Sequence, residues 1–308
     1  MPESKDAGRG FALAIGAYAV WGVVPMYVVL MQGVGAIELI GWRVLASLAV
    51  AAIIVTIVRG WGAVRAVLRD RRSLAFLAAS GIAILVNWTV FAGAVLSGHI
   101  IETSLGYFLN PIVSVVLAVV VLHERLRPAQ WVAVGMSGLA VVVLVVAYRS
   151  FPWIAIALAL AFGVYGLLKK QVGAKVDAIT GFTIETAATV PFALAMLIGS
   201  TIILGPTIVE VSPLVQLAVV GFGVVTAVPL MLFSAAARRV SLATLGFTQY
   251  LAPTISLLFG WLVMHEPMPP ERLAGFALVW LSLVVLMVDL VVAEGRRRRS
   301  PVVPDPAP

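Results

Sequence analysis

The apolar residues of this chain gather into ten long runs that short polar segments separate. Each run is close to the roughly 20 residues that an α-helix needs to cross the hydrocarbon core of a bilayer. Such runs must be helical, because the hydrocarbon core contains no hydrogen-bond partner for backbone N–H and C=O groups that are left unpaired. The pattern therefore predicts an all-α integral membrane protein with ten transmembrane helices, at 10–30, 37–58, 74–96, 101–122, 129–147, 152–169, 179–203, 213–235, 242–264 and 272–292.

The chain also contains the same pattern twice. In both copies a Leu-Gly-aromatic segment leads to a proline, a long apolar run, a His-Glu pair and a second proline. Pro111 and Pro253 are 142 positions apart, as are His123 and His265, and Leu105-Gly106 reappears as Leu245-Gly246. A repeat this long covers the whole chain twice and is a half-protein rather than a solenoid unit.

The repeat predicts three segments. Two five-helix halves occupy residues 1–148 and 149–293, and a basic, proline-rich tail follows at 294–308. We expect disorder in this tail, because it has too little apolar surface to fold.

Five helices per half have a consequence for topology. The second half must enter the membrane from the side opposite to the first, so the two repeats are inverted. With the amino terminus in the cytoplasm, every lysine and arginine except Arg43, Arg149 and Arg272 falls in a cytoplasmic segment. The positive-inside rule therefore places both termini in the cytoplasm.

Composition agrees with a membrane location. Hydrophobic residues make up 62% of the chain and charged residues 11%, against about 25% charged in soluble domains. The apolar surface of the helices therefore faces the lipid bilayer, which is an expected partner of the protein. Topology accounts for the net charge of +7, so no nucleic-acid partner is required. The chain has no cysteine, which excludes disulfide and thiol chemistry.

Four charged residues fall inside or at the ends of the expected spans and are candidates for a charge or coupling role. Arg43 lies within the second span, where a charge costs about 2.5–3.5 kcal/mol unless it is paired or faces water. Glu102 is the expected partner, since Glu38 lies on another face of the same helix. A structural ion pair with no role in solute binding explains these residues equally well.

Glu185 is the fourth of these residues and aligns with Arg43 in the repeat, 142 positions later. Two interpretations stay open. It could relay protons or another coupling cation, or it could form an ion pair with Lys169 or Lys170. Protons are accordingly the candidate coupling ion.

Polar and aromatic residues beside midmembrane prolines are the candidate solute site. Proline frees a backbone carbonyl in the preceding turn, and in lipid such a group must find a partner or face a wet cavity. Kinks that serve packing alone are the alternative. A binding site between the repeats would involve Trp21, Asn87, Trp88, Tyr107, Asn110, Tyr165, Gln249 and Tyr250.

Catalytic and ligand motifs give little support to other functions. Residues 135–138 read GxSG, as in intramembrane serine proteases, but all three histidines lie at helix ends or in loops, away from Ser137. A serine nucleophile needs a base within hydrogen-bond reach, so small-residue packing explains this segment better. The sequence has no phosphate-binding loop and no HExxH, and we expect no catalytic residue, metal or cofactor.

Several long segments of the chain carry a family pattern: AYAVWGVVPMY (17–27), NWTVFAGAV (87–95), TSLGYFLNPI (103–112), ERLRPAQW (124–131), LALAFGVYGLLKK (158–170), IET (184–186), TAVPLMLFSAAAR (226–238) and LGFTQYLAPT (245–254). Together these segments resemble the RarD branch of the EamA family, in the drug/metabolite transporter superfamily. The resemblance spans nearly the whole chain and implies ten helices, a location in the bacterial inner membrane, two inverted repeats and a central cavity. It implies no settled substrate, since the branch is named for an association with chloramphenicol sensitivity.

The residues and the resemblance together predict a multi-pass secondary transporter. We expect it to export a small metabolite or drug-like solute by alternating access around a midmembrane cavity. An intramembrane enzyme is the first alternative, and a passive channel or scaffold is the second.

Overall fold

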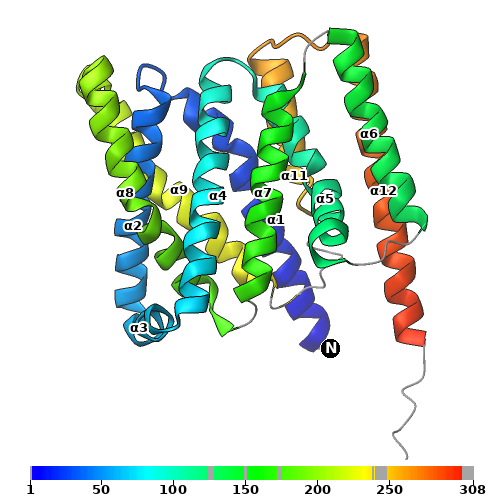
Figure 1. Ribbon diagram of the computed structural model, residues 1–308, viewed down its shortest axis with the longest axis horizontal. Coiled ribbons are helices and arrows are strands. Elements are labelled where there is room, and N and C mark those ends of the chain that lie inside the picture. The colour runs from blue at the N-terminus through cyan, green and yellow to red at the C-terminus, as the bar shows by residue number, and fades with distance from the viewer. Residues whose placement is uncertain are drawn as a thin grey trace, which may run out of the picture.

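The computed structural model describes residues 2–123, 128–148, 151–172, 175–237, 239 and 248–299. Within this part the protein is a bundle of helices (Figure 1). Seven helices are long and apolar enough to cross a membrane, and three further apolar helices are shorter, at Pro128–Val143, Trp153–Lys169 and Leu251–Val263. The all-α membrane class is confirmed, while the number of ten crossings stays a prediction.

The helices follow the expected spans closely. Those of the first half are α1 (Pro2–Val29), α2 (Ala36–Ile57), α3 (Trp61–Arg69), α4 (Arg71–Leu96), α5 (Ile100–Leu122) and α6 (Pro128–Tyr148). Those of the second half are α7 (Trp153–Val172), α8 (Ala178–Leu204), α9 (Pro213–Ala237), α11 (Leu251–Leu258) and α12 (Pro270–Arg299). A short 3-10 turn, η2 (Thr207–Val209), precedes α9, and a π-helical turn, η3 (Phe259–Val263), continues α11.

One feature differs from the expectation, and three others lie outside the described residues. Helix α12 continues to Arg299, so residues 294–299 are helical although their composition assigns them to the tail. The remainder of the tail, the Leu245-Gly246 pair and Glu124 lie outside the described residues.

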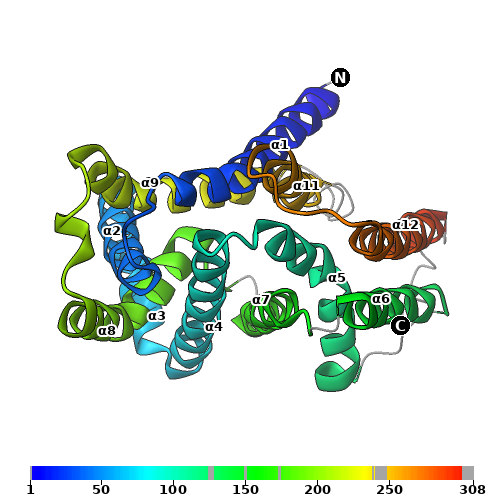
Figure 2. The ribbon, with the colours of Figure 1, turned by 90° about the horizontal axis from the view of Figure 1, so that it is seen from above.

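Helix pairs occur in matched sets, which is the arrangement that an inverted repeat predicts. In the repeat, α1, α2, α4, α5 and α6 correspond to α7, α8, α9, α11 and α12. The packed pair α1–α9 has its counterpart in α7–α4, α2–α9 in α8–α4, and α1–α11 in α7–α5. The pairs α2–α8 and α6–α12 join corresponding helices, and Figure 2 shows them at opposite ends of the bundle.

Helix ends repeat as well. His123 follows α5 and His265 follows η3, and both have a φ of 53°. This left-handed conformation is a common way to end a helix. The two halves therefore share a backbone detail as well as a helix order.

Glycines allow two of these matched pairs to pack closely. A Cβ at Gly81 of α4 would lie 2.6 Å from the carbonyl oxygen of Glu185 in α8. At the corresponding contact, a Cβ at Gly223 of α9 would lie 2.5 Å from the carbonyl group of Ala46 in α2. Both obstacles are backbone atoms that cannot rotate away, so only glycine permits this approach of the two helices.

We expect Gly81→Ala to destabilise the protein by about 1–3 kcal/mol, because the added methyl group must push α4 away from α8. Gly93→Ala is the matched control in the same helix, since a Cβ there meets nothing within 4 Å. That control should be neutral or stabilising by up to about 1 kcal/mol, because alanine favours helix. Thermal unfolding in detergent measures both, and equal melting temperatures would contradict the close contact.

Candidate functional site

Arg43 of α2 lies in a buried group of side chains from three helices. Its side chain is 7% exposed, and its Nε donates a hydrogen bond to Oγ1 of Thr226 in α9 at 3.2 Å. The guanidinium carbon lies 4.0 Å from the ring centre of Trp88 in α4 and 4.4 Å from that of Phe222 in α9. Two rings and one hydroxyl therefore surround this cation.

The prediction that Glu102 forms an ion pair with Arg43 is wrong for the part of the chain that the structure describes. Neither Glu102 nor Glu38 forms an ion pair with it, and the described ion pair involves other residues. Sequence spacing favoured Glu102 because it lies near an outer helix end, but Arg43 points toward α4 and α9 instead.

Glu38 at the start of α2 binds the loop that precedes α9. Its Oε2 accepts hydrogen bonds from the backbone nitrogen and the hydroxyl of Thr207, at 2.9 and 2.5 Å. Its Oε1 accepts one from the backbone nitrogen of Ile208 at 3.3 Å. This buried carboxylate satisfies donors of η2 and fastens the second half to the first.

Glu266 plays a similar part that sequence reasoning missed. It follows η3 and is buried, and its carboxylate accepts hydrogen bonds from the backbone nitrogens of Ile100 and Ile101 at 2.7 and 2.9 Å. These are two of the unpaired donors at the start of α5. The repeated His-Glu pair was the available signal, but it does not reveal a partner so distant in sequence.

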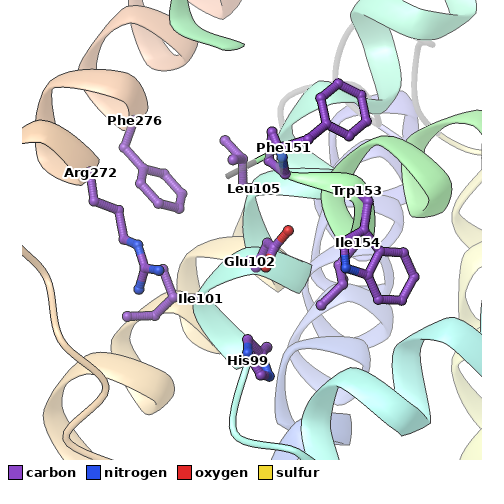
Figure 3. A pocket seen from close by; sticks show the side chains of 10 residues that line it. His99, Ile101, Glu102, Leu105, Phe151, Trp153, Ile154, Arg272 and Phe276 are labelled. Carbon is purple, nitrogen blue, oxygen red and sulfur yellow. The ribbon is translucent and has the colours of Figure 1, made fainter. Parts of the chain in front are cut away.

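Glu102 lines a cavity of about 320 Å³ near the start of α5 (Figure 3). Its carboxylate lies beside the first backbone N–H groups of α7, with His99 and Arg272 within electrostatic reach. Helix α12 contributes one wall of the cavity and α5 and α7 the others. The lining residues are His99, Ile101, Glu102, Leu105, Phe151, Pro152, Trp153, Ile154, Arg272 and Phe276.

A second buried group joins α4, α5 and α7 next to Trp88. The hydroxyl of Tyr107 donates to Oδ1 of Asn87 at 3.2 Å, and Nδ2 of Asn87 donates to the carbonyl oxygen of Leu158 at 3.1 Å. The Tyr107 ring contacts Phe91 and Phe162. Since Trp88 follows Asn87 and faces Arg43, three predicted site residues come together here: Asn87, Trp88 and Tyr107.

The remaining predicted site residues lie in separate contacts. Tyr165 joins this group through Phe162, whereas Trp21 packs against Tyr18 and Phe233. Tyr250 stacks on Phe108 and interacts with the neighbouring Gln249. Trp21, Trp88 and Tyr107 all pack against one buried cluster of side chains, while Tyr250 packs against a second.

Two enclosed polar atoms near these groups have no hydrogen-bond partner among the described residues. They are Oγ of Ser47 and Oδ1 of Asn110. Ser47 lies one helical turn after Arg43 in α2, and Asn110 lies three residues after Tyr107 in α5, so each shares a helix face with a member of the group. A buried polar atom without a partner costs free energy unless water or a ligand satisfies it.

Glu185 forms an ion pair with Lys169, which is one of the two interpretations that the sequence left open. The Nζ of Lys169 in α7 lies 2.9 Å from its Oε1, and the hydroxyl of Ser80 in α4 donates to the same oxygen at 2.5 Å. Lys169 also lies over the ring of Tyr165. A relay role for Glu185 stays a prediction.

The GxSG segment takes part in helix packing. Ser137 of α6 is buried, and its hydroxyl shares a hydrogen bond with that of Ser282 in α12 at 2.7 Å. This contact joins two corresponding helices of the repeat.

Comparisons with known proteins agree with this architecture. The chain matches the EamA-like transporter family over residues 8–146 and 151–288. It is 41% identical to a protein called RarD from Streptomyces exfoliatus, over 97% of this chain and 94% of that one. It is also 41% identical to an uncharacterized transporter from Pseudomonas aeruginosa, over 91% and 94%. A solved crystal structure shares the fold, with a TM-score of 0.56 at 20% identity, over 94% of this chain and 99% of that chain.

We expect Glu185→Gln to destabilise the protein by about 1–3 kcal/mol, because it leaves the ammonium of Lys169 without its partner. The cost falls below the roughly 3–5 kcal/mol of a fully buried pair, since Lys169 is 33% exposed. Adding Lys169→Met should recover part of the loss. Thermal unfolding measures the cycle, with Glu210→Gln at an exposed position as a control that should change little. Strictly additive losses would contradict the pairing.

Proposed function

Because the chain belongs to the EamA-like transporter family, we propose that it is a secondary transporter that exports a small metabolite or drug-like solute by alternating access. It is a multi-pass protein of the inner membrane. The observation that carries the proposal is the buried polar and aromatic group around Arg43, Asn87 and Tyr107. Polar groups inside a membrane bundle typically mark a solute pathway.

The inverted halves supply the proposed mechanism. Transporters built from inverted repeats bind their solute where the repeats meet, and the repeats move against each other around that site. Here α2 and α4 of the first half meet α9 of the second around Arg43. Exchanging the packing of the matched helix pairs would open this region to one side of the membrane and then to the other.

Transport into proteoliposomes tests this function. Labelled chloramphenicol is a suitable first probe, because the branch that this sequence resembles is named for sensitivity to it. Protons are the proposed coupling ion, so uptake is measured with and without an imposed proton gradient. Accumulation above the equilibrium level with the gradient supports a coupled transporter. Flux that only equilibrates the solute would favour the passive channel.

Asn110→Leu and Gln249→Leu should weaken solute binding several-fold while changing the melting temperature little. Oδ1 of Asn110 has no protein partner to lose among the described residues, so its removal costs the fold little. Binding to the purified protein and thermal unfolding are measured on the same samples. Loss of stability with unchanged affinity would make these residues packing elements and place the site elsewhere.

We propose that both termini and α3 are cytoplasmic, and that residues 97–101 and 204–212 face outward. The cysteine-free chain makes single-cysteine labelling direct. Ala66 of α3 and Ser212 are both exposed, which makes Ala66→Cys and Ser212→Cys a matched pair. An impermeant maleimide should label only Ser212→Cys in intact cells and both after lysis. Equal labelling in intact cells would contradict the inverted topology.

A further inference from the structure

Arg43 is a buried cation without a counter-charge among the described residues. Its side chain is 7% exposed, and it lies about two turns inside α2. The rings of Trp88 and Phe222 stabilise the guanidinium through cation–π contacts. These rings carry no net charge, so they do not neutralise it.

The hydrogen-bonding capacity of Arg43 is only partly used. A guanidinium has five N–H donors in a fixed fork, and Nε uses its one donor on Thr226. The two terminal nitrogens have no acceptor among the described residues. A pair of parallel N–H donors matches the two oxygens of a carboxylate better than any neutral group.

Two further buried polar atoms have no hydrogen-bond partner among the described residues. The hydroxyl of Ser47, on the same face of α2 as Arg43, is fully buried and has no hydrogen-bond partner in the described part of the chain. Oδ1 of Asn110 is likewise enclosed and without a partner there. Asn110 shares its face of α5 with Tyr107, which lies within electrostatic reach of Arg43. A ligand at Arg43 would therefore meet a cation and, one helical turn along α2, the hydroxyl of Ser47.

The repeat offers an internal comparison. Glu185 occupies the position in α8 that Arg43 occupies in α2, and it is held by Lys169 and Ser80. The charge in the second half is thus neutralised within the protein. The corresponding charge in the first half has a hydroxyl and two rings but no acid among the described residues, so the two halves differ in the counter-charge.

From these observations we propose that Arg43 binds the acidic group of the transported solute, and that the solute is an organic carboxylate. The proposal rests on the proposed transport function and adds the chemical class of the solute to it. The guanidinium binds the carboxylate, and Trp88, which is only partly buried, packs against the apolar body. An arginine that served helix packing alone would not distinguish a carboxylate from its amide.

Binding is tested on purified full-length protein in detergent, so that the result does not depend on transport. The probes are acetate, benzoate and indole-3-acetate, each compared with its neutral amide, while tryptamine adds a cationic probe. Melting temperature is followed against probe concentration in a chloride-free buffer. We expect saturable stabilisation by at least one carboxylate, and none by its amide or by tryptamine. Equal effects of the acid and the amide would overturn the proposal without any variant.

Variants assign the effect to Arg43. Arg43→Gln should weaken carboxylate binding at least tenfold, and Arg43→Lys should retain part of it because the charge remains. Arg272→Gln is the control, since it removes a guanidinium in the cavity beside Glu102. If Arg43→Gln does not fold, Arg43→Lys and the acid–amide comparison decide. Unchanged affinity in Arg43→Gln, or a loss in Arg272→Gln as large as the loss in Arg43→Gln, would overturn the assignment.

Inorganic phosphate and chloride separate a bound counter-ion from a solute. If either one stabilises the wild-type protein as strongly as the carboxylates, Arg43 holds a small anion and the solute class is wrong. Failure of the transport function is distinguishable, because carboxylate binding would then persist without flux of the labelled carboxylate in proteoliposomes.

Discussion

Hydrocarbon offers no hydrogen-bond partners, so every polar group inside the bundle must find one in the protein. The buried carboxylates meet this condition with groups from distant parts of the chain. Glu38 binds η2, Glu266 binds the first turn of α5, and Glu185 binds Lys169 and Ser80. Each contact joins segments that the apolar surface alone would leave free to slide. Arg43 meets the same condition only in part, and this contrast is why we propose a solute contact at Arg43 and a structural role for the three carboxylates.

The matched helix pairs show how the same constraint acts in both halves. Gly81 and Gly223 bring α4 against α8 and α9 against α2 through backbone contacts. These contacts give each half a firm attachment to the other at two related places. Arg43 and Phe222 lie next to the Gly223 contact, and Trp88 of α4 completes their group. We propose the solute site at this group because it carries a charge without a counter-charge among the described residues, whereas backbone atoms close the glycine contacts.

Sequence patterns predicted the helices, the repeat and the membrane class, because each depends on spacing within a continuous segment. The length of an apolar run decides whether it crosses, and a 142-residue offset is visible without a structure. The partners of buried charges could not be predicted this way. The contact of Glu266 with Ile100 joins residues 166 positions apart, and Arg43 turned toward two rings rather than toward the expected acid. Spacing shows which residues share a helix face, but helix rotation and packing decide what that face meets.

The connection between the two buried groups follows from adjacent residues of one helix. Trp88 faces Arg43, while Asn87 binds Tyr107 of α5 and the backbone of α7. A carboxylate bound at Arg43 would contact Trp88 in α4 and thereby act on the helix that also carries Asn87. A ligand shifts a conformational equilibrium only through contacts that differ between the two states. In the mechanism that we propose, the contacts that would differ are those of Arg43 with α4 and α9 and those of α4 with α7. Neutralising Arg43 removes the cost of its uncompensated charge, and the occupied protein then prefers the packing in which the guanidinium and Trp88 contact the carboxylate more closely.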